Sequence, residues 1–233
     1  MKLFRIVCLV AVSRALLENV SGQGFVDLNF ERAVIVTDPS VPYYPYGVYA
    51  SNAIPGWTAF GFISPNYILY NDISLGATSV SIVGTNSQYS PSSLDGRFSI
   101  DLYGGTSVGA MPPGASISQT GLVPLNALSI RFIAQGVGGG PLLVSLGGQN
   151  ISFSAISAGP SYTLYGGDVS GFAGQIEQLT FTALVGVNNY WEIDDIQFSP
   201  FAVPEPSTLS LLSICILFLT PKEMEKFRRP LHP

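Results

Sequence analysis

The central part of this sequence, from Gly24 to Pro200, contains no cysteine, no histidine and no lysine. Without histidine or cysteine it cannot form a Ser-His-Asp or Cys-His nucleophile, a His-rich zinc site or an iron–sulfur cluster. Without lysine it cannot form a Schiff base or a Walker-type phosphate site. The two cysteines of the chain, Cys8 and Cys215, stand in the terminal apolar segments. There is therefore no disulfide framework, and the central domain must rely on its hydrophobic core.

Positive charge is also scarce in this central part, which holds eight Asp and three Glu against three Arg, a net charge of −8. Three arginines cannot neutralise a run of phosphates, so nucleic acid is not an expected partner. Only 11% of the 233 residues are charged, whereas Gly and Pro number 25 and 17, which speaks against long helices and against a disordered acidic tail. Carboxylate-pair chemistry and calcium held by oxygen ligands stay open. An acidic surface without lysine suits a protein outside the cytoplasm.

Residues 1–23 predict a secretory signal peptide. Lys2 and Arg5 form a positive start, and Ile6–Val12 forms a short apolar run. We expect cleavage after Gly22, because small residues precede it there. The alternatives are an uncleaved apolar N-terminus and a mis-called start codon.

Residues 201–233 predict a C-terminal sorting tail in three parts. A proline-containing motif over residues 203–208 precedes a hydrophobic segment over 208–220 and a basic end over 222–229. Proline disfavours helix at the residue before it, so we expect the motif to be extended and accessible to an enzyme. Basic residues beyond the apolar segment would hold that end in the cytoplasm. The motif consists of Val203, Pro204, Glu205, Pro206, Ser207 and Thr208.

This tail resembles the PEP-CTERM sorting signal of Gram-negative bacteria, which is also labelled an ice-binding protein C-terminal domain. The resemblance implies export, tethering to the inner membrane by a transmembrane helix, processing by an exosortase-type transpeptidase, and a final place in the cell envelope or outside the cell. The uncharged run from Pro206 to Pro221 has 16 residues, about 24 Å as a helix, which is short of the roughly 30 Å hydrocarbon core. Ice binding needs a flat repeated array of hydroxyls, and no sequence repeat is visible.

The region 24–200 alternates between apolar and polar residues, with turn residues every 8 to 12 positions, in about ten segments. No stretch has a helical stripe over three turns. This pattern predicts an all-β domain, an antiparallel β-sandwich or jelly roll. We expect a hairpin with a Gly147-Gly148 turn and a helical turn or compact loop within 168–174. The expected strands include Phe25–Phe30, Ser79–Val83, Arg97–Tyr103, Leu128–Ile133, Gln178–Leu184 and Trp191–Phe198.

Three segments resemble parts of galactose-binding-like jelly rolls. Asp27–Glu31 and Ile54–Trp57 look like the opening of such domains, and Trp191–Phe198 looks like their final strand. The resemblance implies that the first and last strands meet and that acidic residues there hold a structural calcium.

Glu31, Asp194 and Asp195 are the carboxylates we expect to ligate calcium, with Asn29 as a further oxygen ligand. Adjacent Asp194 and Asp195 face opposite sides of a regular strand, so a shared site would need a β-bulge between them. The neighbouring apolar pair Ile193 and Ile196 also breaks the alternation, which favours a bulge. Solvated carboxylates at a strand edge are the alternative.

Four tyrosines, Tyr43, Tyr44, Tyr46 and Tyr49, gather in one proline-containing loop. Their rings are of the kind that stack on sugar faces, so we expect a carbohydrate site there. The alternative is a loop packed over the end of the sandwich. Trp57 and Trp191 are expected in the core.

The sequence thus predicts an exported structural or carbohydrate-interacting module rather than an enzyme. The alternative is a polysaccharide-active enzyme with an unrecognised carboxylate site, which would need one acid and one base at a set separation. Nothing in the sequence brings two of the carboxylates together. The candidates for such a pair are Asp95, Asp101, Asp168 and Glu177.

Overall fold

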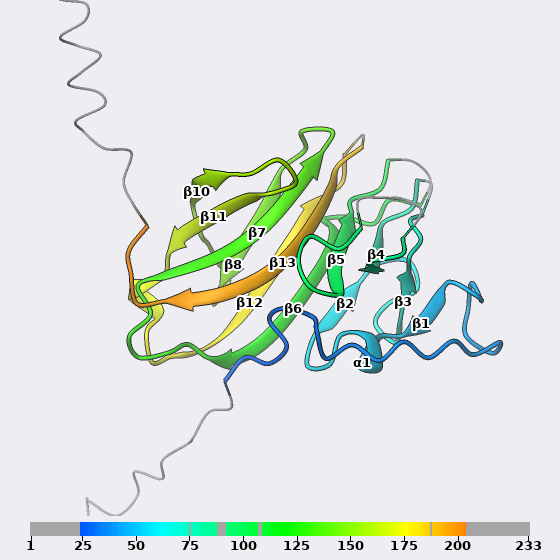
Figure 1. The fold of residues 1–233 in the computed structure, drawn as a ribbon, viewed down its shortest axis with the longest axis horizontal. Coiled ribbons are helices and arrows are strands. Elements are labelled where there is room, and N and C mark those ends of the chain that lie inside the picture. The colour runs from blue at the N-terminus through cyan, green and yellow to red at the C-terminus, as the bar shows by residue number, and fades with distance from the viewer. Residues whose placement is uncertain (1–23, 75, 88–91, 107–108, 187, 204–233) are drawn as a thin grey trace, which may run out of the picture.

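The chain forms two β-sheets packed face to face in the computed structural model, which describes residues 24–203 except 75, 88–91, 107–108 and 187 (Figure 1). The larger sheet has the strand order β1-β3-β4-β5-β13-β7-β11-β10, and the smaller has the order β2-β6-β12-β8-β9. The strands of the larger sheet are β1 (Gly47–Tyr49), β3 (Tyr67–Tyr70), β4 (Ser79–Gly84), β5 (Phe98–Tyr103), β7 (Ser129–Val137), β10 (Phe153–Ala158), β11 (Thr163–Asp168) and β13 (Tyr190–Ser199). Those of the smaller sheet are β2 (Thr58–Phe60), β6 (Gly114–Leu122), β8 (Leu142–Leu146), β9 (Gln149–Asn150) and β12 (Ile176–Leu184). The described helices are a four-residue turn, α1 (Ala50–Ala53), and a 3-10 turn, η1 (Ser170–Phe172).

The core lies between the two sheets and is built from the inward positions of each strand. Phe132 of β7 and Phe181 of β12 meet edge to face, with their ring centroids 5.2 Å apart. Ile100 of β5 and Ile117 of β6 are fully buried in the same cluster. These apolar residues alternate with residues on the outer faces. The structure therefore confirms the all-β sandwich that the period-two pattern predicts.

One pair of strands departs from the antiparallel arrangement that the sequence predicts. β3 runs parallel to β4, with Leu69 opposite Ser81 and Tyr70 opposite Ile82. Parallel neighbours ordinarily need a long crossover connection. Here the ladder is only two residues long, so the loop over 71–78 suffices to return the chain.

The predicted strand Phe25–Phe30 is wrong. These residues form an irregular segment that ends in a turn, outside both sheets, with φ of 51° at Asp27 and 55° at Phe30. The Asp27 carboxylate accepts a hydrogen bond from the Arg32 backbone N–H at 2.9 Å. Such a local side-chain bond offers the backbone an alternative to a ladder, and aspartate tolerates the left-handed region. The apolar residues of this segment still pack on the core.

The predicted bulge in the last strand is confirmed. The pairing of β13 with β7 shifts register between Asp194 and Gln197, and Asp195 has a φ of 45°. The extra residue lets Ile193 and Ile196 both point into the core. At the same place the Ile196 N–H donates to the Leu28 carbonyl at 2.9 Å, so the N-terminal segment meets the last strand.

The other predicted strands and turns are present with shifted ends. β4, β5, β7, β12 and β13 correspond to the five remaining predicted strands. The hairpin at Gly147-Gly148 forms, but its second strand, β9, has two residues, and β10 pairs with β11 in the other sheet. The predicted signal peptide (1–23), the residues Pro204 to Thr208 of the sorting motif and the hydrophobic and basic parts of the tail lie outside the described residues. Within the described part of the chain, no helix is long and apolar enough to cross a membrane.

Candidate functional site

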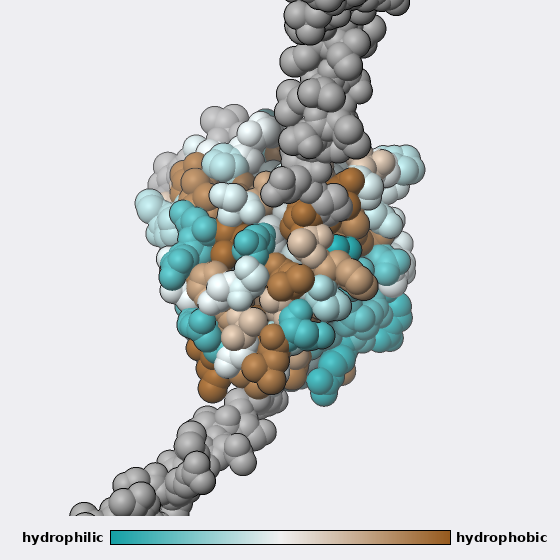
Figure 2. All heavy atoms as spheres, turned by 90° about the vertical axis from the view of Figure 1, so that its left-hand side faces the viewer, coloured by the Kyte–Doolittle hydropathy of each residue, from teal (hydrophilic) through white to brown (hydrophobic). Residues whose placement is uncertain are grey.

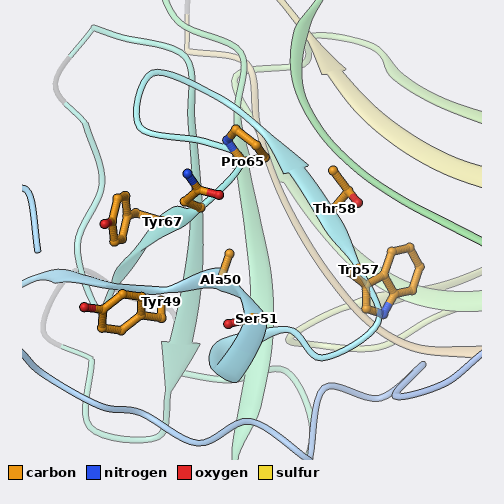
Figure 3. A pocket seen from close by; sticks show the side chains of 8 residues that line it. Tyr49, Ala50, Ser51, Trp57, Thr58, Pro65 and Tyr67 are labelled. Atoms are coloured by element: carbon orange, nitrogen blue, oxygen red, sulfur yellow. The ribbon is translucent and has the colours of Figure 1, made fainter.

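An open hollow of about 390 Å³ lies beside the short helix α1, at the end of the molecule that carries β1 (Figure 3). Three aromatic side chains define its sides: Tyr49 and Tyr67 lie on one side and Trp57 on the other. The ring centroids of the two tyrosines are 5.4 Å apart. The rest of the lining is small or polar and comprises Ala50, Ser51, Thr58, Pro65 and Asn66.

The local fold explains why these side chains converge. β1 pairs with β3 so that Tyr49 stands directly opposite Tyr67. The helix α1 begins immediately after Tyr49 and brings Ser51 to the rim. The Trp57 ring is fixed in position, because its indole N–H donates a hydrogen bond to the Asp27 carbonyl at 3.1 Å. It is 6% exposed, which confirms its predicted place in the core.

The hollow therefore offers ring faces together with hydroxyl and amide groups. Its volume lies within the roughly 300–1,000 Å³ of small-molecule pockets. The lining contains no charged side chain among the described residues. Such a surface suits a neutral ligand with both C–H faces and hydroxyls, which is the chemistry of a sugar.

The four predicted tyrosines do not act as one cluster. Tyr49 lines the hollow, and its hydroxyl donates to Asp38 at 3.3 Å. Tyr43, Tyr44 and Tyr46 are 57%, 52% and 40% exposed on the preceding loop. Tyr43 meets Phe62 edge to face at 4.9 Å. The predicted loop thus contributes one ring to the hollow, and sequence reasoning missed Tyr67, which comes from a different strand.

The carboxylates predicted to hold calcium each have their own partners. Burial tends to raise the pKa of Glu31, but hydrogen bonds from Arg97 and Phe98 outweigh it and lower that pKa. Asp194 is buried and accepts from the backbone N–H groups of Asp95 and Asp195 at 3.2 and 2.7 Å. Burial raises its pKa to about 8.

Asp195 instead accepts from the Gln197 side chain at 2.6 Å, and Asn29 is exposed. Among the described residues, no three His, Cys, Asp or Glu side chains are grouped so as to hold a metal ion. A calcium ion on Glu31, Asp194 and Asp195 stays a prediction.

A second group of carboxylates, which sequence reasoning did not bring together, lies on the outer face of the larger sheet. Asp101 of β5 pairs directly with Glu192 of β13, and the two are 2% and 0% exposed. Tyr190 donates a hydrogen bond to Asp101, and Ser99 donates one to Glu192. Burial raises the pKa of Asp101 to about 8, and burial together with the charge of Asp101 raises that of Glu192 to about 9.

The opposite end of the molecule presents a different surface. Figure 2, viewed from the β10–β11 end, shows a mosaic of hydrophobic and hydrophilic residues. Phe201, close to the last described residue, is 70% exposed there. Its carbonyl accepts hydrogen bonds from Ser129 at 2.7 Å and Arg131 at 3.4 Å. The chain is thus fixed to β7 two residues before Val203, where the predicted sorting motif begins.

No protein-family model matches this chain, and no curated protein matches it. Among solved structures, it is similar to the enzymatically active domain of tailspike protein 4 of bacteriophage CBA120, with 15% sequence identity and a TM-score of 0.37. That match covers 62% of this chain and 19% of the tailspike chain. The resemblances to the PEP-CTERM signal and to galactose-binding-like jelly rolls stay predictions from the sequence. What the structure establishes is a β-sandwich of two sheets with an aromatic hollow at one end.

Proposed function

We propose that this chain is an exported module of the cell envelope or extracellular matrix that binds carbohydrate in the hollow between Tyr49, Tyr67 and Trp57. The observation that carries the proposal is the combination of ring faces and uncharged hydrogen-bonding groups in one open hollow. A sugar ring would lay its C–H face on Tyr67 or Tyr49. Its hydroxyls would exchange hydrogen bonds with Ser51, Thr58 and Asn66.

The test is binding of the purified full-length protein to an array of neutral and acidic glycans. Tyr49→Ala combined with Tyr67→Ala should abolish binding, because the ring faces are lost while the buried Trp57 is kept. Tyr162→Ala is the matched control, since Tyr162 is exposed at the far end of the sandwich. Equal binding by the double variant and the parent would contradict the proposal.

We further propose that the sandwich is delivered by a PEP-CTERM sorting tail and processed by an exosortase-type enzyme at the inner membrane. The order of motif, apolar segment and basic end in the sequence supports this proposal. The anchoring of the Phe201 carbonyl supports it too, because the motif then starts at the surface of the domain. An enzyme could reach it there without unfolding a strand.

A fractionation blot in a host that carries the sorting enzyme tests the tail. Removal of residues 207–233 should release the protein to the periplasm or medium. Replacement of Pro204, Glu205 and Pro206 together by alanine should leave full-length protein in the membrane, because the recognition segment is lost and the anchor remains. Processing of the triple variant like the parent would show that the tail is an anchor alone.

The second candidate function is a polysaccharide-active enzyme. The adjacent carboxyl groups of Asp101 and Glu192 are the observation that favours it, but both are buried away from the surface. A polymer cannot reach them, and no carboxylate lines the hollow among the described residues. We therefore propose no enzymatic role. Release of reducing sugar from a bound glycan would overturn this proposal.

A further inference from the structure

A row of four polar residues crosses the outer face of the larger sheet. Ser81 of β4 stands opposite Asp101 of β5, Asp101 opposite Glu192 of β13, and Glu192 opposite Gln135 of β7. Directly opposite residues have their Cβ atoms about 4.5–5.5 Å apart, so neighbours in this row lie side by side. On each of these strands the residues next to the row are apolar and point into the core. Because side chains alternate between the two faces of a sheet, the four polar side chains lie on the outer face.

Three oxygens in this row have no partner. Asp101 Oδ1, Glu192 Oε2 and Gln135 Oε1 are each buried, and none accepts a hydrogen bond within the described structure. The other oxygen of each carboxylate is already bonded, to Tyr190 and to Ser99. Two of the unpartnered oxygens therefore belong to carboxylates that are otherwise held in place.

No arginine of the described chain donates a hydrogen bond to this row. Arg97 forms an ion pair with Glu31 at 3.0 Å, and Arg131 bonds the carbonyls of Phe201 and Ala202. Leaving buried polar atoms unpaired carries a desolvation penalty, which is larger for charged groups. A protein that keeps three such oxygens adjacent on three strands is expected to supply them with a common partner.

We propose that Asp101, Glu192 and Gln135 form a calcium site on the outer face of the larger sheet. The donor set consists of oxygen alone, from two carboxylates and one amide, which is the set that Ca²⁺ prefers. The two negative charges match the charge of the ion. Gln135 is half-buried, so the row reaches the surface at this residue. Water can enter there and complete the six to eight ligands that Ca²⁺ takes. This site is distinct from the one predicted at Glu31, Asp194 and Asp195.

The test uses the purified full-length protein, stripped with chelator, and CaCl₂ as the probe at pH 8. Thermal melts should rise by several degrees in calcium at 100-fold excess over Kd, because an ion that binds the native state alone stabilises it by about 2.7 kcal/mol under that condition. Titration calorimetry should give one ion per chain at this site. An unchanged melt would mean that the pair is held by protons alone and would overturn the proposal.

Two variants locate the ion. Asp101→Asn combined with Glu192→Gln keeps the size and hydrogen-bonding of the pair but removes its charge, so this protein should fold and lose the calcium response. Asp195→Asn, on the bulge, should keep that response. A response that survives the first variant, or that is lost in the second alone, would place the ion elsewhere and overturn the assignment.

Discussion

Asp101 of β5 and Glu192 of β13 are cross-strand partners on the outer face of the larger sheet, and both are buried. Two carboxyl groups so placed cannot both ionise cheaply, because burial and their mutual repulsion favour the protonated forms. Their pKa values of about 8 and 9 express this cost. The fold therefore depends on protons or a cation at one defined point of the sheet.

This relationship makes the stability of calcium-free protein depend on pH. Below pH about 4 both carboxyls are protonated in the folded and unfolded chains, and their contribution to stability is complete. As pH rises, the unfolded chain ionises first, so the contribution is lost progressively until pH 8 to 9. Asp194, whose pKa is about 8, acts in the same direction.

The melting temperature in chelator should therefore fall by several degrees between pH 5 and pH 9. The Asp101→Asn, Glu192→Gln variant should show a flatter profile over the same range, measured by differential scanning fluorimetry. Parallel profiles for the variant and the parent would show that other groups cause the pH dependence.

Glu31 should matter more than its ion-pair partner. Its carboxylate accepts hydrogen bonds from the Arg97 side chain at 3.0 Å and from the Phe98 backbone N–H at 3.1 Å, which ties the N-terminal turns to the start of β5. Glu31→Ala should cost about 1–3 kcal/mol, because a backbone donor loses its charged partner. Arg97→Ala should cost less than about 1 kcal/mol, since Arg97 is largely exposed. Urea unfolding of both variants gives the comparison, and equal losses would refute it.

Gly114, at the start of β6, should tolerate substitution poorly. Its φ is +138°, and a Cβ there would lie 1.9 Å from the Ala183 carbonyl oxygen of β12. Gly114→Ala should cost about 3 kcal/mol or more, from backbone strain and from separation of the two strands. Gly148→Ala is the matched control: its φ is +76°, but nothing lies within 4 Å, so about 1–2 kcal/mol of strain is expected. A smaller loss at Gly114 than at Gly148 would contradict this account.

Phe132 should carry a large share of the core. It is fully buried and contacts the rings of Phe153, Tyr165 and Phe181. Phe132→Ala should lower the free energy of unfolding by about 3–5 kcal/mol, whereas Leu125→Ala, at a position 85% exposed, should change it by less than about 0.5 kcal/mol. Chemical denaturation measures both.

Much of the sandwich could be predicted because alternation is a local signal. The break in alternation at Ile193 and Ile196 even located the bulge in β13. The same signal misled at Phe25–Phe30, where a local hydrogen bond from Arg32 to Asp27 favours a turn over a strand. The alternation of residues within one segment does not predict whether another strand lies beside it to form a ladder.

The candidate sites were harder to predict, since their members meet only through strand pairing. Tyr67 joins Tyr49 because β3 pairs with β1, and Glu192 joins Asp101 because β13 pairs with β5. The outward positions Ser79 and Ser81 of β4 are both buried, which the alternation of the sequence does not predict.

β13, the strand from which the C-terminal tail departs, lies inside the larger sheet (Figure 1). It pairs with β7 from Tyr190 to Ser199 and with β5 from Tyr190 to Ile193. A protein held by its C-terminus transmits mechanical load through this strand, along its axis. Pulling along an inner strand shears many backbone hydrogen bonds at once, whereas pulling on an edge strand peels them one by one. The topology thus predicts that β13 resists a pull on the C-terminal end of the domain more strongly than an edge strand would.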